Sequence, residues 1–170
     1  MLSDSHGRRE RLLEVMSAHW NVRAVLFLGD GLREAISVAD ELGLPLEAVR
    51  GNCDMFGSAD GFRYQEEQIL SFGAYTILMM HGHTRSVKSG IEQAVARAVQ
   101  VKADVLLYGH THLREERYLP AGTYVGEIIL PRPLWIMNPG SVGRPSGASP
   151  SYGVITIQGK DLLLSFGRLS

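Results

Sequence analysis

Residues 104–112 read DVLLYGHTH, and this stretch contains the pattern on which the fold depends. The apolar run that ends at Tyr108 predicts a short strand buried on both faces. Gly-His-Thr-His follows at once, and residues two apart on an extended segment point to the same side. His110 and His112 are therefore predicted to bind one metal ion together, where the strand ends.

The same arrangement, a metal-capable side chain just past an apolar run, recurs in five other places. Asp4 and His6 are again two residues apart, and the glycines before Asp30, Asn52 and His110 let the backbone turn sharply. Because the carboxyl ends of strands in α/β sheets face a common crevice, we expect these stretches to meet. They are Asp4-Ser5-His6, Gly29-Asp30, Gly51-Asn52-Cys53-Asp54, His81-Gly82-His83 and Asn138-Pro139-Gly140-Ser141.

The spacing of apolar residues predicts an α/β domain. Helices and strands alternate early and strands dominate later, so we expect helix-covered sheets with an antiparallel portion at the C-terminal end. No linker divides the chain, and residues 1–170 are predicted to form a single domain. The expected helices span residues 9–20, 31–42 and 89–101, and the expected strands span residues 24–28, 47–50, 68–72, 75–81, 104–108, 134–138, 153–157 and 161–166.

The composition argues against several classes of protein and site. The chain has 170 residues, a net charge of −1 and a single cysteine, Cys53. One cysteine cannot form an intrachain disulfide or a multi-cysteine zinc site. No block of like charge indicates a nucleic-acid-binding face, and no apolar run has the length of a membrane span. We therefore expect a cytoplasmic protein that acts on a small substrate.

Taken in order, the motifs resemble the calcineurin-like metallophosphoesterase superfamily, whose signature runs D-x-H, GD, GN, H, GHxH. The chain looks closest to the short bacterial and archaeal YfcE-like phosphodiesterases, a branch related to the small retromer subunit. The resemblance implies a four-layer α/β/β/α sandwich and two metal ions with Asp30 between them. It implies that one ion is held by Asp4, His6, Asp30 and His112, and the other by Asp30, Asn52, His81 and His110.

The ligand types indicate the chemistry. Two divalent ions about 3.5 to 4 Å apart can activate a bridging hydroxide and hold the phosphoryl oxygens, so no protein nucleophile is required. Imidazole, carboxylate and amide ligands suit Mn²⁺, Ni²⁺, Zn²⁺ or Fe better than Ca²⁺ or Mg²⁺. Mn²⁺ is favoured, partly by the resemblance. The expected function is hydrolysis of a small phosphodiester, with a monoester as the alternative.

One position departs from the family pattern. Many members read GNH[ED], whereas this chain has Cys53, and a thiol with a pKa of about 8.5 is a poorer acid at neutral pH than an imidazolium. Either the substrate has a good leaving group, or Asp54 or water supplies the proton; alternatively, Cys53 is only a small packed residue. The residues expected to act in catalysis are Asn52, His81, Cys53 and Asp54.

Three more side chains are candidates for contact with the substrate. His83 is expected to contact the substrate or support a metal ligand rather than bind metal. Arg85 and Arg144 are candidates for holding a phosphate, because a guanidinium group matches its oxygens. Both arginines can equally be surface charges.

Two segments lead to further expectations. Residues 114–133 are predicted to contain an inserted hairpin that turns at Ala121-Gly122 and covers the site, binds a partner such as a second copy of the chain, or simply lies at the surface. Only Met1, Leu2 and Ser3 precede Asp4, where the family has a longer central strand, so the natural chain is expected to begin further upstream. The rival to an enzyme is a scaffold of the retromer-subunit kind with a vestigial metal site.

Overall fold

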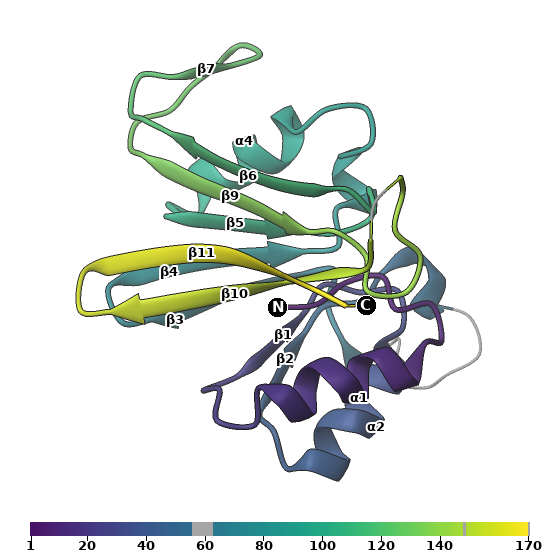
Figure 1. Cartoon of the computed structure of the whole chain (residues 1–170). Coiled ribbons are helices and arrows are strands. Elements are labelled where there is room, and N and C mark those ends of the chain that lie inside the picture. Colours follow the sequence, from purple (N-terminus) through teal and green to yellow (C-terminus); the bar gives the residue numbers. More distant parts are fainter. Residues whose placement is uncertain (56–62, 148, 170) are drawn as a thin grey trace.

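Two sheets pack face to face, and helices cover both outer sides, which gives the four layers α/β/β/α (Figure 1). The computed structural model describes residues 1–55, 63–147 and 149–169. This arrangement is the sandwich that the resemblance implied. The helices are α1 (Arg9–Ala18), α2 (Leu32–Leu42) and α4 (Glu92–Gln100), and the short 3₁₀ turns are η1 (Asn52–Met55) and η2 (His83–Arg85).

The larger sheet places the histidine-bearing loops at one edge. Its strand order is β3-β4-β5-β9-β6, and the three inner strands β4, β5 and β9 are parallel neighbours. The loops that follow these three strands therefore leave the sheet at the same end. The strands are β3 (Glu67–Phe72), β4 (Tyr75–Met80), β5 (Val105–Tyr108), β6 (Arg114–Leu119) and β9 (Leu134–Pro139).

The other sheet is assembled from both ends of the chain. The first three residues lie between two strand pairs: Leu2 N donates to Leu26 O at 2.8 Å, and Met1 and Gly153 exchange two backbone hydrogen bonds of 2.8 and 2.9 Å. The N-terminal residues thus join the pairs into one sheet. The pairs are β1 (Val25–Phe27) with β2 (Leu46–Ala48), parallel, and β10 (Ser151–Gln158) with β11 (Asp161–Arg168), antiparallel.

Three apolar clusters fill the three interfaces between the layers. In β5, Val105 and Leu107 pack between the sheets, while Leu106 and Tyr108 pack toward α4. Burial on both faces explains why this strand is apolar at every position. The strand predicted over residues 104–108 is confirmed, and the other predicted elements are confirmed within a few residues at each end.

The segment 114–133 differs from its prediction. β6 pairs along its whole length with β9, so the edge strand belongs to the main sheet. The separate hairpin is smaller and consists of β7 (Tyr124–Val125) and β8 (Ile128–Ile129). The predicted turn at Ala121-Gly122 is confirmed, since Thr123 N donates to Pro120 O across it at 3.2 Å, but the reversal of the hairpin itself lies between β7 and β8. That the segment is an insertion stays a prediction.

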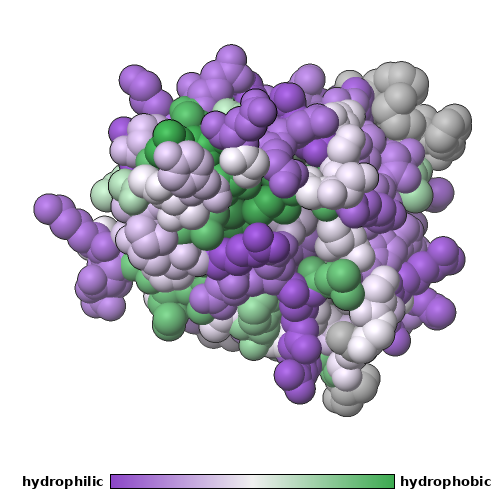
Figure 2. All heavy atoms as spheres, turned by 90° about the horizontal axis from the view of Figure 1, so that it is seen from above, coloured by the Kyte–Doolittle hydropathy of each residue, from purple (hydrophilic) through white to green (hydrophobic). Residues whose placement is uncertain are grey.

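The β7–β8 hairpin lies at the end of β6 remote from the loop that follows β5 (Figure 1). It therefore does not cover that loop. Apolar side chains gather on the corresponding half of the upper face (Figure 2), and the exposed large residues of this region include Tyr118, Tyr124 and Ile129. Among the described residues, no helix has both the length and the apolar character needed to cross a membrane.

Candidate metal centre

The loops at the strand ends bring most of the expected metal ligands into one cluster. Three groups of side chains have ligand atoms that all lie within 4.8 Å of one another: two of them each contain three residues of one expected set, and the third consists of His6, Asp30 and Cys53. Asp30 connects the first two, because its Oδ2 lies 3.5 Å from His81 Nε2 and 3.9 Å from His6 Nε2. These two ligand groups are Asp4, His6 and His112, and Asp30, His81 and His110.

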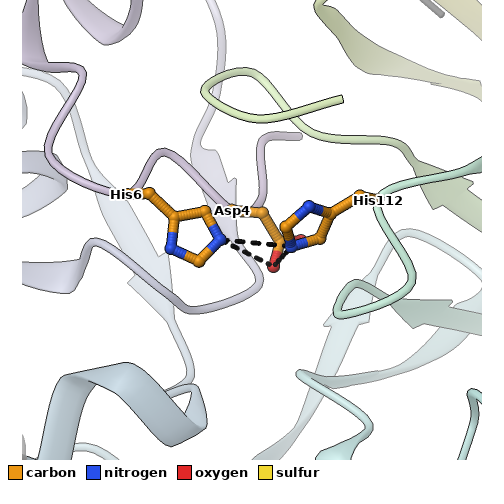
Figure 3. Close-up of side chains that lie close together, drawn as sticks. All are labelled: Asp4, His6 and His112. Carbon is orange, nitrogen blue, oxygen red and sulfur yellow. Dashed lines mark hydrogen bonds and ion pairs between the residues drawn. The ribbon is translucent and has the colours of Figure 1, made fainter. Parts of the chain in front are cut away.

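The first group converges from two parts of the fold, the N-terminal segment that carries Asp4 and His6 and the loop that carries His112 (Figure 3). Nε2 of His112 lies 3.1 Å from Nε2 of His6 and 3.1 Å from Oδ1 of Asp4. Nε2 of His6 lies 3.9 Å from the same Asp4 oxygen. Two ring nitrogens and a carboxylate oxygen therefore face one point.

Asp4 has one oxygen that is satisfied and one that is not. Its Oδ2 accepts hydrogen bonds from Ser3 Oγ at 2.5 Å and from the backbone N–H of His110 at 3.0 Å. Its Oδ1 is buried without a hydrogen bond and lies 3.1 Å from Nε2 of His112. A buried carboxylate oxygen without a donor is unfavourable unless a cation contacts it. This oxygen points to the place where a cation fits.

Backbone carbonyls orient one histidine in each group. Nδ1 of His112 donates to the carbonyl oxygen of Arg144 at 2.6 Å, and Nδ1 of His81 donates to that of Leu28 at 2.6 Å. Each of these hydrogen bonds leaves the lone pair of Nε2 free in the neutral ring. Metal-binding histidines are oriented in the same way in other proteins.

The backbone is strained at the same residues. Of the seven described non-glycine residues with positive φ, five belong to the two groups. Such conformations cost about 1–3 kcal/mol each and persist where the surrounding structure enforces them, most often at functional sites. The five residues are Asp4 (φ 55°), His6 (46°), Asp30 (60°), His110 (67°) and His112 (60°).

Gly51 allows the loops to approach closely. A Cβ atom at this position would lie 2.6 Å from the backbone nitrogen of Asp30, and it would also collide with the Asp30 carboxylate. The expectation that a glycine is needed before Asn52 thus has a steric reason.

Electrostatics in the cluster keeps the Asp30 carboxylate ionised and the His110 ring neutral. Burial would raise the pKa of Asp30, but the hydrogen bond and charge of His81 outweigh it and hold this pKa well below its usual range. Burial would likewise lower the pKa of His81, but Asp30 and Asp4 raise it. Burial and the charges of His81 and Lys88 lower the pKa of His110 to about 4. The ionised carboxylates and a neutral imidazole suit a bound cation.

Asn52 and Cys53, which were expected to act in catalysis, are both exposed and lie at the start of η1. Asn52 Nδ2 donates to Cys53 Sγ at 3.4 Å, and Cys53 N donates to Asp30 Oδ1 at 2.8 Å. Partial desolvation and the neighbouring carboxylates, Asp30 foremost, raise the pKa of the Cys53 thiol to about 11. The thiol is therefore protonated at neutral pH. The assignment of Asn52 as a ligand stays a prediction.

Asp54 fixes the backbone around the site. Its carboxylate accepts hydrogen bonds of 2.7–2.9 Å from four backbone N–H groups. Both oxygens are thus occupied, so the geometry favours a positioning role over the expected donation of a proton to the substrate. The donors are the N–H groups of Asp30, Gly31, Leu32 and Gly51.

The three further candidates lie in different surroundings. The ring of His83 lies 5.3 Å from that of His81, outside both ligand groups, and its buried Nδ1 has no hydrogen bond. Arg85 is engaged by Glu67, at 3.1 Å. Arg144 is exposed, and its charge acts on His6.

Two residues support the ligands in ways that the sequence did not indicate. Ser3 donates to the Asp4 carboxylate, and only its position before a metal-binding motif could have suggested this. Asn138 is fully buried and donates to the carbonyl of Gly109 at 2.9 Å and to Thr111 Oγ1 at 3.0 Å. An asparagine at the end of an apolar strand was the available signal.

Comparisons with known proteins agree with this geometry. A model of the calcineurin-like phosphoesterase superfamily domain matches residues 1–160. The chain belongs to this superfamily. The probable metallophosphoesterase YsnB of Bacillus subtilis is 31% identical over 160 residues, which cover 93% of this chain and 83% of the relative. The phosphodiesterase YfcE of Escherichia coli K12 is 33% identical over 174 residues, which cover 90% of this chain and 84% of the relative.

A solved structure of Vps29 from Entamoeba histolytica, in complex with Zn²⁺, shares the fold. The TM-score is 0.64 at 22% sequence identity, with 92% of this chain and 88% of that chain covered. Calcineurin-like phosphoesterases depend on metal, so a metal ion is expected in this chain. The residues of the two ligand groups are suited to bind one. The unsatisfied Asp4 Oδ1 and the oriented ring nitrogens of His81 and His112 provide this fit.

Proposed function

We propose that the chain is a phosphodiesterase that binds two divalent metal ions, one at each ligand group, and hydrolyses a small phosphate ester. The position of Asp30 carries this proposal, because a carboxylate within 4 Å of a histidine of each group can serve both ions. The name of YfcE supports the diester, and the Zn²⁺ complex of Vps29 supports a divalent ion. Mn²⁺ is proposed first, with Ni²⁺, Zn²⁺ or Fe as alternatives, because the donors are nitrogen and oxygen atoms.

Each proposed residue has a defined task. When bound, such a pair of ions supplies an activated water nucleophile and stabilises charge during in-line attack at phosphorus. Asp30 holds the two positions together, and the carbonyls of Leu28 and Arg144 orient His81 and His112. Asn52 completes the second group, and Cys53 lies on the exposed side, where the substrate enters. With a thiol pKa of about 11, Cys53 is a weak proton donor, so substrates with good leaving groups are favoured.

The experiment compares hydrolysis of an aryl phosphodiester and an aryl phosphomonoester with and without added Mn²⁺. We expect metal-dependent hydrolysis that is faster on the diester. The variants Asp30→Ala and His110→Ala should lose it, whereas His19→Ala, at the end of the first helix, should not. Equal rates for the wild type and the first two variants would exclude catalysis at this site.

A second candidate function is that of a scaffold. The fold is shared with Vps29, and Cys53 occupies a position where many superfamily members have a histidine. In that case metal binding would persist without turnover. Metal content per chain, measured together with the rates above, separates the two functions.

A further inference from the structure

Cys53 belongs to a third group of possible metal ligands, which adjoins the two ligand groups. Its Sγ, a ring nitrogen of His6 and a carboxylate oxygen of Asp30 all lie within 4.8 Å of one another. His6 is shared with the first ligand group and Asp30 with the second, whereas the cysteine belongs to neither. The centre therefore offers a combination of ligands that the two expected sets do not include.

The separations in this third group suit a single ion. Zn–S bonds are about 2.3 Å long and Zn–N or Zn–O bonds about 2.0–2.2 Å, so two ligands of one ion lie at most about 4.5 Å apart. Nε2 of His6 and Oδ2 of Asp30 are 3.9 Å apart, which is within this limit. Because Cys53 is exposed, its side chain is free to close the small remaining distance.

Backbone hydrogen bonds hold Cys53 against Asp30. The N–H group of Cys53 donates to Asp30 Oδ1 at 2.8 Å. Asp54 joins the two loops, since its Oδ2 accepts hydrogen bonds from the N–H groups of Gly51 at 2.7 Å and of Asp30 at 2.8 Å. These contacts occupy Oδ1 of Asp30 and leave its Oδ2 on the side of the His6 ring. The cysteine and the carboxylate are thus placed together by the fold.

An unsatisfied buried oxygen lies beside the same histidine. Asp4 is fully buried, its Oδ1 has no hydrogen bond, and His6 Nε2 lies 3.9 Å from this oxygen. A cation bound to His6 is attracted by the charge of Asp4 as well as by that of Asp30. Cys53 is therefore the exposed member of a site whose buried side already favours a cation.

Sulfur gives the third group a different metal preference from the other two. Thiolate ligands favour Zn²⁺, whereas oxygen ligands suit Mn²⁺. A thiol loses its proton to water when an ion binds it. Asn52 Nδ2 donates to Cys53 Sγ at 3.4 Å, and a hydrogen bond of this kind supports a metal-bound thiolate. The amide oxygen of Asn52 stays available to the second ligand group.

The third group and the first cannot both be filled. A neutral imidazole has one lone pair in the plane of its ring, so His6 binds one ion at a time. An ion held by Cys53, His6 and Asp30 takes this histidine from Asp4 and His112. The two arrangements of ions therefore exclude each other.

We propose that Cys53, His6 and Asp30 form a third metal position, which is selective for Zn²⁺ and competes with the first. Zn²⁺ at this position arrests the Mn²⁺-dependent hydrolysis, because the first ligand group is left without His6. Only this last step rests on the proposed function, since binding of Zn²⁺ by sulfur requires no turnover.

X-ray absorption of the Zn²⁺-saturated protein tests the sulfur ligand directly. Cys53 is the only cysteine of the chain, so a Zn–S shell at about 2.3 Å reports on this residue. We expect the shell in the wild type and its loss in Cys53→Ser, which nearly keeps the size of the side chain. His6→Ala should also lose it, although the second ligand group remains. His19→Ala is the matched control and should keep it.

Inhibition by Zn²⁺ tests the competition. Hydrolysis of the aryl diester by the Mn²⁺-loaded proteins is titrated with Zn²⁺, and each rate is expressed relative to the same protein without Zn²⁺. We expect half-inhibition of Cys53→Ser to require about tenfold more Zn²⁺ than that of the wild type, because one thiolate ligand is lost. His19→Ala should be inhibited like the wild type.

The outcomes separate this inference from the proposed function. Absence of the Zn–S shell from the wild type would overturn the third position and leave the proposed function in place. Persistence of the shell in His6→Ala would also overturn it, because an exposed thiol would then bind Zn²⁺ alone. Equal inhibition of the wild type and Cys53→Ser would refute the competition. If the shell depends on Cys53 and His6 but no protein hydrolyses the diester, the proposed function fails and the third position stands.

Discussion

The Nε2 atoms of His6 and His112 lie 3.1 Å apart, although the two residues are separated by 106 positions in the sequence. The other ring nitrogen of His112 is committed to a backbone carbonyl, so in the neutral ring its Nε2 carries a lone pair. Two imidazole nitrogens and the unsatisfied Asp4 oxygen then face each other, and a cation between them would satisfy all three.

Bound metal should therefore stabilise the fold. A ligand at about 100 times its Kd adds about 2.7 kcal/mol, which raises Tm by about 5–10 °C in a chain of this size. We expect this rise when Mn²⁺ is added to chelator-treated wild type in a thermal melt. His112→Ala should lose most of it. His19→Ala is the matched control, because the ring of His19 contacts only Tyr152 among hydrogen-bonding groups of the described residues, at 3.1 Å. The same rise in both variants would contradict the assignment of His112.

Gly51→Ala should lower metal affinity although it replaces no proposed metal ligand. The added Cβ would lie 2.6 Å from the Asp30 backbone nitrogen, which cannot move independently of the loop. Overpacking of this kind costs about 1–3 kcal/mol, and metal affinity should fall with it. Gly43→Ala provides the comparison, since its Cβ meets nothing within 4 Å and only its positive φ is unfavourable. Urea unfolding and metal titration would be measured on both, and unchanged metal affinity in Gly51→Ala would argue against the close approach.

Asp54 is expected to stabilise the loops through its hydrogen bonds to backbone N–H groups rather than to donate a proton to the substrate. Asp54→Ala leaves four backbone N–H groups without their acceptor, so we expect a loss of about 2–3 kcal/mol in unfolding free energy. Asp54→Asn keeps one acceptor oxygen and should lose less. Asp40→Ala, an exposed carboxylate on α2, is the control and should change stability by less than about 0.5 kcal/mol. If Asp54→Ala unfolded like wild type but lost hydrolysis alone, the proton-donor role would be restored.

The sequence predicted the metal ligands best where a metal-binding side chain directly follows the end of a strand. His110 and His112 were found because an apolar strand buried on both faces is easy to recognise, whereas Asp4 and His6 were found from their two-residue spacing. The division of these residues between two ions came from the resemblance. Spacing alone cannot relate residues that are 106 positions apart.

The strand β6 and the role of Asp54 could not be predicted from the pattern of side chains. β6 reads REERYL, and all six residues of this edge strand are exposed or only half-buried, so no apolar pattern indicates a strand. The role of Asp54 consists of hydrogen bonds to backbone N–H groups, which no side-chain pattern reveals.

The ion pairs of Glu67 give stability a defined pH dependence. Burial would raise the pKa of Glu67, but the hydrogen bonds from Arg97 at 2.7 Å and Arg85 at 3.1 Å outweigh it and lower this pKa. A carboxylate with a lowered pKa in the folded state contributes stability above its unfolded pKa of about 4.5, and this contribution is lost as the pH falls through the folded value. We expect Glu67→Gln to cost about 1 kcal/mol at pH 7 and much less near pH 3. Urea unfolding at both pH values measures the difference. Glu14→Gln, an exposed residue of α1, should show no such trend, and a constant cost for Glu67→Gln would contradict the assignment.

The cavity beside Met1 should accept a designed strand. It has a volume of about 690 Å³ and is lined by β1 and β10, whose facing edges are joined only by the first three residues among those described. Burial lowers the pKa of the Met1 amino group to about 5, which shows that its charged form is disfavoured there. Four apolar residues added before Met1 would remove this charge from the interior, pair with both edges and fill the cavity. At about 0.8 kcal/mol for each buried methylene, Tm should rise by several degrees. A Gly-Ser extension of the same length removes the charge but fills nothing, so an equal Tm for the two extensions would show that the cavity does not take a strand.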